Sequence, residues 1–272
     1  MINNNSKKER LDLVLLEKGF FESREKAKIA IMEGLIYVNN QKEDKPGSMI
    51  KKDAVVEFRG KNIPYVSRAG FKLEKAIKSF NINLSNSICI DIGSSTGGFT
   101  DCMLQFGAKK VYAIDCGTNQ LAYKLRIDKK VILYENLNAK YISRDIVDDD
   151  IDFMSMDVSF ISVSKLLLPV SNVINDRARA VILIKPQFEV GRENVGNGVI
   201  KNKKLHIDVI KKIIDLSKIL NYSILGLDYS PIKGAKGNIE YLLYITKEIV
   251  KDIDIESSII EVVNKSHEML GE

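Results

Sequence analysis

The sequence predicts an α/β protein with a Rossmann-like, mostly parallel, seven-stranded sheet, preceded by a small α+β domain. The first observation is the alternation of short apolar runs with segments of helical period over residues 88–246. The second is a glycine-bearing turn, GSSTGG, directly after the first of these runs. The third is a different pattern near the amino terminus, with two short helices and two strands. We therefore expect domains over residues 1–59 and 67–272, joined by a linker over 60–66.

The composition favours a cytoplasmic protein with two hydrophobic cores. The chain has 272 residues, of which 45% are hydrophobic, enough for one large core and one smaller one. No apolar run approaches the roughly 18 residues that span a bilayer, and MINNNSKKER lacks the apolar part of a signal peptide. The two histidines and three cysteines have no ligand-like spacing. We expect no metal site, no membrane contact and a monomeric free state.

The net charge of +5 comes entirely from one end of the chain. Residues 1–72 carry 15 Lys+Arg against 10 Asp+Glu, and the remaining residues are balanced. A basic module on a neutral body is typical of a domain that binds a polyanion and delivers it to an enzyme. Charge alone is explained equally well by solvated surface lysines.

Two helices and two strands are predicted before residue 59. The first helix ends at Gly19, and the second is capped by Ser23 and ends at Gly34. Strands are expected at 35–38 and 54–58. The second helix carries a row of basic side chains, which suits contact with a phosphate backbone. The residues expected to contact phosphate groups are Arg10, Arg24, Lys26, Lys28, Arg59 and Lys61. For the last two, plain surface charge is the equal alternative.

Residues 88–106 predict a buried strand, a glycine turn and an amphipathic helix. The spacing G-x-x-x-G-G differs from that of dinucleotide sites and P-loops, and no lysine follows to meet a phosphate. A carboxylate at the end of the second strand suits ribose hydroxyls. Together these features suit S-adenosylmethionine, with a ligand-free crossover as the alternative. The expected cofactor-binding residues are Asp91, Gly93, Ser94, Thr96, Gly97, Gly98, Phe99, Asp115, Asn138 and Asp157. Asp91 could instead only cap the turn, and Asn138 only begin a helix.

The other elements of the larger domain follow in order. Ser67 is expected to cap a helix whose apolar stripe runs from Leu73 to Phe80. Lys72 lies off this stripe, so spacing alone predicts a solvated side chain. A later helix is expected to begin at Thr118. Strands are expected at 111–114, 131–134, 151–156, 180–184, 223–228 and 239–246, with helices near 163–170 and over 203–220.

Charged residues stand at the ends of several predicted strands. Asp91, Asp115, Asp157 and Lys185 fall at carboxyl ends, where α/β sheets bind ligands, and Glu240 starts the final strand. A lysine beside a second lysine, held by two carboxylates in a partly dry cleft, can accept a proton. This arrangement suits removal of a proton from a sugar hydroxyl.

Five motifs resemble one family in order: SRAGFKLEKA, DIGSSTGGFTDCMLQFGAKKVYAID, DVSFIS, LIKPQFEVGRENVG and SPIKGAKGNIEYL. Over residues 10–246 the chain resembles the TlyA (haemolysin A-like) family of ribosomal RNA 2′-O-methyltransferases. Its first part resembles the S4 RNA-binding domain, and its second part is similar to FtsJ-type methyltransferases. The resemblance implies S-adenosylmethionine as donor, cytidine in 16S and/or 23S rRNA as acceptor, and ribosomal subunits as partners.

The resemblance also implies a catalytic tetrad. The lysine-aspartate-lysine-glutamate set of FtsJ-type enzymes falls on Lys72, Asp157, Lys185 and Glu240. By that resemblance Lys185 is the base nearest the 2′-hydroxyl and Asp157 orients it, while Lys72 and Glu240 shape the ribose pocket.

Three alternatives stay open beside this reading. Methyl transfer to a base is disfavoured because DVSF lacks both prolines of [NDS]-P-P-[FY]. A membrane-acting haemolysin and a non-catalytic ribosome-binding or RNA-binding factor are the other two. The segment 188–202, which contains Gly191, Gly196 and Gly198, is either a lid that reorders on RNA or a plain loop.

Overall fold

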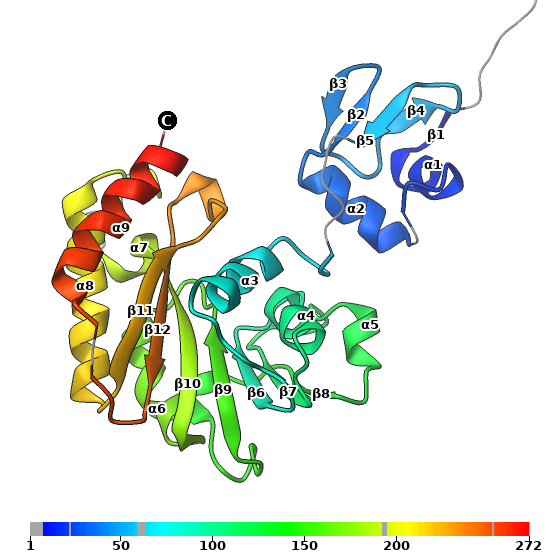
Figure 1. The fold of residues 1–272 in the computed structure, drawn as a ribbon. Helices are drawn as coiled ribbons and strands as arrows, with labels where there is room; N and C mark the ends of the chain where they lie inside the picture. Colours follow the sequence, from blue (N-terminus) through cyan, green and yellow to red (C-terminus); the bar gives the residue numbers. More distant parts are fainter. Residues whose placement is uncertain (1–7, 22, 59–63, 192–194, 252, 272) are drawn as a thin grey trace, which may run out of the picture. The chain divides into compact units, whose positions relative to one another are not determined.

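The chain divides into two compact units, Met1–Ser67 and Arg68–Glu272, each with its own hydrophobic core. The computed structural model describes residues 8–21, 23–58, 64–191, 195–251 and 253–271 (Figure 1). Residues 64–66 of the predicted linker group with the first unit, whereas 60–63 lie outside the described residues.

The first unit packs two helices against short strands. The helices are α1 (Leu11–Glu17) and α2 (Arg24–Met32), and the strands are β1 (Lys8–Arg10), β2 (Ile36–Val38), β3 (Gln41–Glu43), β4 (Met49–Lys51) and β5 (Val56–Phe58). Strand β2 pairs antiparallel with β3 and β5, and β1 pairs antiparallel with β4. Ser23 caps α2 as predicted, because its hydroxyl accepts a hydrogen bond from the amide of Lys26 at 3.3 Å. Strands β1, β3 and β4 were not predicted, because each is only three residues long and too short to show an apolar alternation.

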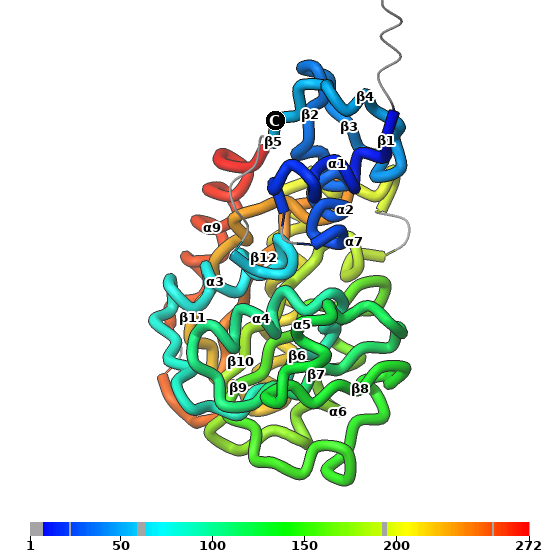
Figure 2. Tube along the Cα trace, turned by 90° about the vertical axis from the view of Figure 1, so that its right-hand side faces the viewer, coloured from blue at the N-terminus to red at the C-terminus, as the bar shows by residue number. Residues whose placement is uncertain are grey.

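The second unit is built on a seven-stranded sheet in the order β11-β12-β10-β9-β6-β7-β8. The strands are β6 (Ile88–Ile92), β7 (Lys110–Ile114), β8 (Val131–Tyr134), β9 (Ile151–Met156), β10 (Ile174–Ile184), β11 (Ser223–Tyr229) and β12 (Tyr241–Thr246). In the described sheet, β12 pairs antiparallel with β10 and β11, and the other pairings are parallel. Strands β9, β6, β7 and β8 follow one another across the trace in Figure 2. The predicted mostly parallel, Rossmann-like fold is confirmed.

Helices cover both faces of this sheet. They are α3 (Gly70–Ser79), α4 (Gly98–Gln105), α5 (Tyr123–Arg126), α6 (Leu167–Ser171), α7 (Pro186–Glu189), α8 (Lys203–Ile219) and α9 (Ile255–Leu270), with 3₁₀ turns η1 (Ala139–Tyr141), η2 (Val163–Lys165) and η4 (Ala235–Gly237). Helix α3 packs on α4, which lies against β6 and β7, whereas α8 packs on α9 and β11 (Figure 1).

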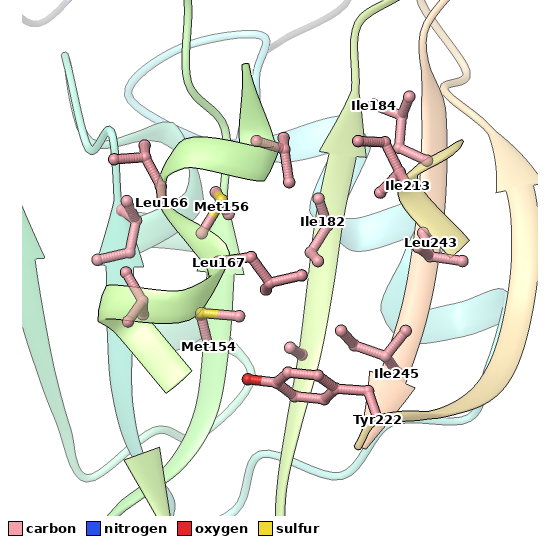
Figure 3. Packing of buried hydrophobic residues seen from close by; sticks show 14 of the residues in the cluster. Met154, Met156, Leu166, Leu167, Ile182, Ile184, Ile213, Tyr222, Leu243 and Ile245 are labelled. Atoms are coloured by element: carbon pink, nitrogen blue, oxygen red, sulfur yellow. The ribbon is translucent and has the colours of Figure 1, made fainter. Parts of the chain in front are cut away.

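Alternate residues of the central strands form the main core. On β9, β10 and β12 every second side chain points to one face, where α6 and α8 cover it (Figure 3). The labelled residues are Met154, Met156, Leu166, Leu167, Ile182, Ile184, Ile213, Tyr222, Leu243 and Ile245, each at most 3% exposed. This packing fixes the strands, and therefore fixes the residues at their ends.

Two predicted helix starts are wrong, and two helices, α7 and α9, were not predicted. Helix α3 begins after Ala69 and not at Ser67, because main-chain bonds from Phe71 to Arg68 and from Lys72 to Ala69 form a turn before it. The helix expected from Thr118 is only the short α5, since the amide of Gln120 is held in a loop by the carboxylate of Glu135 at 3.1 Å. Helix α9 was not predicted, although its apolar positions 255, 259 and 263 recur at helical spacing.

Candidate active site

Four charged side chains meet near the carboxyl ends of β9 and β10. Lys72 comes from α3, Asp157 follows β9, Lys185 follows β10, and Glu240 precedes β12. Lys72 Nζ lies 2.6 Å from Glu240 Oε2 and 3.9 Å from Asp157 Oδ2. Lys185 Nζ lies 2.5 Å from Asp157 Oδ1. The two groups form an ion pair, but their geometry is not that of a hydrogen bond. The fold thus brings together the four residues predicted as a tetrad, in the spatial order Glu240, Lys72, Asp157, Lys185.

This cluster is nearly closed to solvent and electrically balanced. The side chains of Lys72 and Lys185 are each 9% exposed, that of Asp157 is 14% exposed, and that of Glu240 is 2% exposed. Buried charges require partners of opposite sign, and here two cations face two anions. The solvated position that spacing alone predicts for Lys72 is wrong, because the α3 side chain reaches the buried carboxylate of Glu240.

Three neighbours of the tetrad were not predicted. The hydroxyl of Ser159 accepts a hydrogen bond from Lys185 Nζ at 2.9 Å, and Gln187 Nε2 donates one to Glu240 Oε1 at 3.4 Å. Gly234 lies against Glu240, because a Cβ atom there would lie 2.0 Å from Glu240 Oε1 and would force that carboxylate to shift. All three fall within the quoted sequence motifs, which is the signal that could have found them.

The glycine turn lines a small cavity of about 150 Å³ beside this cluster. The lining residues are Ala69, Gly93, Ser94, Ser95, Thr96, Gly98, Phe99, Asp157, Ser159 and Lys185. Gly93 has φ +83°, and a Cβ there would lie 2.5 Å from the main-chain oxygen of Asp157. Gly97 has φ +94°, and its Cβ would lie 2.3 Å from Leu125. Both positions therefore require glycine.

The polar groups of the turn suit a small polar ligand. The buried hydroxyl of Ser94 has no hydrogen-bond partner among the described residues. The turn also leads into the first amides of α4, which carry partial positive charge. A ligand with hydrogen-bonding groups would satisfy these donors.

The other predicted cofactor residues have different surroundings. Asp91 is fully buried and accepts hydrogen bonds from Thr100 at 2.7 Å and Ser155 at 2.9 Å. Its carboxyl group therefore supports the turn and does not line the cavity. Burial raises the pKa of Asp91 to about 6.

Asp115 and Asn138 both accept hydrogen bonds from main-chain amides. Asp115 accepts them from Ser95 at 2.8 Å and Gly117 at 2.7 Å. Asn138 is exposed and caps η1 through the amide of Lys140 at 3.1 Å.

An unpredicted aromatic side chain stands next to the tetrad. Phe160 is 92% exposed and has φ +62°, unusual for a bulky residue. Its ring centroid lies 5.1 Å from that of Phe188, and Lys185 Nζ lies 5.9 Å from the centroid of Phe188. Phe160 therefore combines an exposed ring with a left-handed backbone, and it follows Ser159, which contacts Lys185.

In the first unit, two of the predicted RNA-binding arginines converge on one acid. Arg10 donates to both carboxylate oxygens of Asp12, at 3.0 and 2.9 Å, and Arg24 Nε donates to Oδ2 at 2.9 Å. The Asp12 side chain is 0% exposed, whereas those of Arg10 and Arg24 are 42% and 39% exposed. The hydrogen bond from Arg10 is the main cause that lowers the pKa of Asp12 to about 2.

The remaining predicted RNA contacts lie on α2 or beyond the described part. Lys26 is exposed and Lys28 is half-buried on α2. Arg59 and Lys61 lie outside the described residues. In the ranges that are described, no helix is long and apolar enough to cross a membrane.

Comparison with known proteins agrees with this geometry. Residues 65–247 match the FtsJ-like methyltransferase family, and residues 9–56 match the S4 domain. Hemolysin A of Brachyspira hyodysenteriae is 47% identical over 86% of this chain and 98% of its own length. The 16S/23S rRNA (cytidine-2′-O)-methyltransferase TlyA of Mycobacterium tuberculosis is 32% identical over 88% of this chain and 90% of its own length.

A solved structure shows the same likeness. It comes from Streptococcus thermophilus, carries a hemolysin name, is 43% identical and covers 97% of both chains with a TM-score of 0.78. The methyltransferase match spans more than half of this chain, and the named relatives match most of it. The chain therefore belongs to the FtsJ-like methyltransferases and, with its S4 domain, to the TlyA family.

Proposed function

We propose that this protein transfers a methyl group from S-adenosylmethionine to the 2′-oxygen of a cytidine in 16S and/or 23S ribosomal RNA. The observation that carries the proposal is the buried, alternating cluster of Lys72, Asp157, Lys185 and Glu240 beside the glycine-turn cavity. The names of the relatives, one of which is a cytidine-2′-O-methyltransferase, support the choice of ribose as acceptor.

The cavity fits the polar end of the proposed cofactor. When bound, S-adenosylmethionine supplies an electrophilic methyl group on a sulfonium. The residues that would hold it are Gly93, Ser94, Thr96, Gly97, Gly98 and Phe99 of the turn, together with Asp157. Asp115 would accept ribose hydroxyls, because each carboxylate oxygen has a second lone pair beyond the amide it already binds. Asn138 is proposed to meet the adenine, and Asp91 to hold the turn in place.

Lys185 is the better placed of the two lysines to accept a proton. It lines the cavity, and its amine is aimed by Asp157 and Ser159. Lys72 does not line the cavity, and its amine is engaged by Glu240 at 2.6 Å. We therefore assign Lys185 as the base: after its ammonium group has released a proton to solvent, the neutral amine takes the 2′-hydroxyl proton, and Lys72 with Glu240 positions it through Asp157.

Positioning contributes more than proton removal in this scheme. A general base typically contributes about 10²–10⁴ in rate. Correct alignment of two reacting groups can contribute roughly 7–11 kcal/mol. The closed tetrad restricts the orientation of Lys185 on two sides, and Gly234 allows the loop to approach Glu240 closely. These contacts keep the acceptor site rigid.

Phe160 is proposed to bind the base of the target nucleotide. RNA enzymes commonly stack an unpaired base on an aromatic ring. Phe160 exposes its ring next to Ser159, which contacts Lys185. A base on this ring would therefore bring its own ribose toward the amine.

The first unit is proposed to supply RNA affinity. Arg10, Arg24, Lys26 and Lys28 would contact phosphates, and Arg59 and Lys61 remain predictions of the same kind. The convergence of Arg10 and Arg24 on Asp12 holds two guanidinium groups together, which suits a bidentate phosphate contact.

The test is methylation of ribosomal subunits taken from cells that lack this protein. With labelled S-adenosylmethionine, we expect incorporation into rRNA and a primer-extension stop at low dNTP at one or two cytidines. Lys185→Ala serves as the control for background incorporation. Absence of both incorporation and donor binding by calorimetry would favour the non-catalytic binding factor, and leakage of liposomes would favour the haemolysin.

A further inference from the structure

A second and larger cavity opens elsewhere in the second unit. It has a volume of about 770 Å³ and lies between the start of α8, the end of α9 and the loop between β11 and β12. This volume falls within the roughly 300–1,000 Å³ that is typical of ligand sites. Its lining shares no residue with the glycine-turn cavity. The proposed methyl transfer therefore gives it no role.

The lining combines a basic rim with an apolar floor. Ile200 and Ile239 are 4% and 6% exposed and form part of the floor with Leu270. The described residues of the rim include four lysines and one carboxylate: Lys201, Lys203, Lys233, Lys236 and Glu268. We call this site the lysine cavity. This balance attracts an anion, and the floor accommodates an apolar or aromatic group. A nucleotide has both parts.

One buried amide holds the two walls of this cavity together. Asn238 is 2% exposed, and its Nδ2 donates to the main-chain oxygens of Gly198 at 2.7 Å and Ala235 at 2.9 Å. Its Oδ1 accepts from the amide of Ile200 at 3.0 Å. Segments 40 residues apart in the chain are thereby fixed to each other. The cavity is a built feature and not a gap between mobile side chains.

The turn that presents two of the lysines also contacts the tetrad. Lys236 and Gly237 have φ +56° and +89°, and these left-handed residues fold the loop tightly. Within the same turn, Gly234 packs against the carboxylate of Glu240. Ile239, the neighbour of Glu240, lines the lysine cavity. A ligand in this cavity would therefore lie close to the acceptor site.

The two histidines join the far wall of the cavity to the same strand. His267 lines the cavity, and its Nε2 lies 3.2 Å from Nδ1 of His206. His206 Nδ1 in turn lies 2.6 Å from the hydroxyl of Tyr241, the residue after Glu240. The cavity is thus linked to the residues on both sides of Glu240 in the sequence, Ile239 and Tyr241.

We propose that the lysine cavity binds a nucleotide of the substrate RNA that neighbours the methylated one. The phosphate would lie among Lys201, Lys233 and Lys236, and the base would lie on Ile200 and Ile239. The inference rests on the proposed function in one respect, that RNA is the substrate. A free nucleoside phosphate has the same chemistry, and the experiment below separates the two sources.

The main experiment compares two charge reversals of equal size in the full chain. Lys233→Glu with Lys236→Glu alters the cavity, and Lys129→Glu with Lys130→Glu alters exposed lysines that precede β8. Binding of an rRNA fragment is measured by fluorescence anisotropy over a series of salt concentrations. We expect the cavity variant to lose at least tenfold in affinity and its salt slope to become shallower by about 1–2, since each neutralised phosphate contributes about 0.7–0.9. The control pair should change affinity less than threefold.

A second measurement needs no substitution. The wild-type protein is cross-linked to rRNA that contains 4-thiouridine, and the attached peptides are identified. We expect cross-links within residues 199–203 or 233–239. Equal affinity and salt slope for both variants, or cross-links that avoid these segments, would overturn the inference.

The outcomes separate this inference from the proposed function. If the wild-type protein methylates rRNA while the cavity variant binds RNA normally, the cavity assignment fails and the function stands. If no methylation is found but the cavity variant alone loses RNA, the function fails and the cavity stands. Calorimetric binding of free CMP that is lost in the cavity variant, with RNA binding intact, would replace RNA by a free nucleotide as the ligand.

Discussion

Both units contain a carboxylate at most 14% exposed that holds two cations, but they expose those cations very differently. In the first unit Asp12 holds Arg10 and Arg24, whose side chains are 42% and 39% exposed. In the second unit Asp157 contacts Lys185 and Lys72, whose side chains are each 9% exposed. The first arrangement leaves positive charge at the surface, where a partner can reach it. The second keeps positive charge inside, where it can act on a substrate that enters.

The choice of cation follows the same division. Arginine stays charged and offers a planar fork of donors that matches phosphate, so it suits binding. Lysine is a compact amine that can release and accept a proton, so it suits general-base chemistry. In the proposed function, the acid beside arginines would therefore organise an affinity site, and the acid beside lysines a reactive one.

The largest expected effect is on the reactive cluster. We expect Lys185→Met to lower kcat by about 10²–10⁴, because the side chain keeps its length but loses its amine. Donor binding, followed by calorimetry, should stay near the wild-type value. Lys129→Met, which removes the amine of an exposed lysine without an assigned role, serves as the matched control, with kcat unchanged. Activity retained by Lys185→Met would remove this residue from the mechanism and erase the contrast between the two clusters.

Glu240 tests whether burial makes the second cluster interdependent. Glu240→Gln should lower the free energy of unfolding by about 3–5 kcal/mol, because it leaves Lys72 buried without its 2.6 Å partner. Lys72→Met combined with Glu240→Gln should recover most of that stability and still be inactive. The free energies of unfolding of the single and the double variant are measured by urea denaturation. A loss below about 1 kcal/mol for the single variant would mean that the pair behaves like an exposed one.

The two clusters also differ in what the sequence could predict. Strand ends such as Asp157 and Lys185 could be placed because apolar runs and helical periods locate the strands. Lys72 and Glu240 lie 168 positions apart, and local spacing made Lys72 a surface residue. Only the likeness of whole motifs brought it into the tetrad. No periodicity encodes such a contact, because it depends on where α3 lies against the sheet.

The smaller contacts were missed for a similar reason. Asp12 holds residues 2 and 12 positions away, yet its role was not predicted, because the helix pattern around it shows only apolar spacing. The contact of Gly234 with Glu240 arises from the approach of a loop, which no local rule contains. Asn238 joins segments 40 residues apart through a single amide. Sequence patterns therefore place the longer strands and most helices, but they miss short elements such as β1, β3, β4 and α7, and they do not encode contacts between distant elements.

A third buried acid, without any cation, sharpens the comparison. Asp91 is held by two hydroxyl groups, and burial raises its pKa to about 6. Since the unfolded chain releases this proton near pH 4, the free energy of unfolding should fall between about pH 4 and pH 6 and then level off. Asp91→Asn should lack that fall and be more stable than wild type at pH 7.5 by on the order of 2 kcal/mol. Thermal melts from pH 4 to pH 8 measure this, and identical profiles for both proteins would contradict it.

The smallest expected effect is that of Asp12→Asn on RNA binding. Whether binding weakens or tightens decides between two roles of Asp12. The pKa of Asp12 is lowered to about 2, so its stabilising contribution is complete above about pH 4 and is lost only as pH falls toward 2. At pH 7.5, Asp12→Asn keeps the size of the side chain but removes the charge on which Arg10 and Arg24 converge. The unit then gains one positive charge, so a diffuse electrostatic contact predicts tighter RNA binding.

If Asp12 instead aims the two guanidinium groups at one phosphate, RNA binding should weaken about 3- to 10-fold despite the added charge. Asp44→Asn, which changes an exposed acid of the same unit by the same charge, provides the control and should strengthen binding slightly. Anisotropy with the same rRNA fragment measures both. Tighter binding by Asp12→Asn would mean that the arginines attract RNA only through diffuse electrostatics. In that case, only the second unit would use an acid to orient its cations.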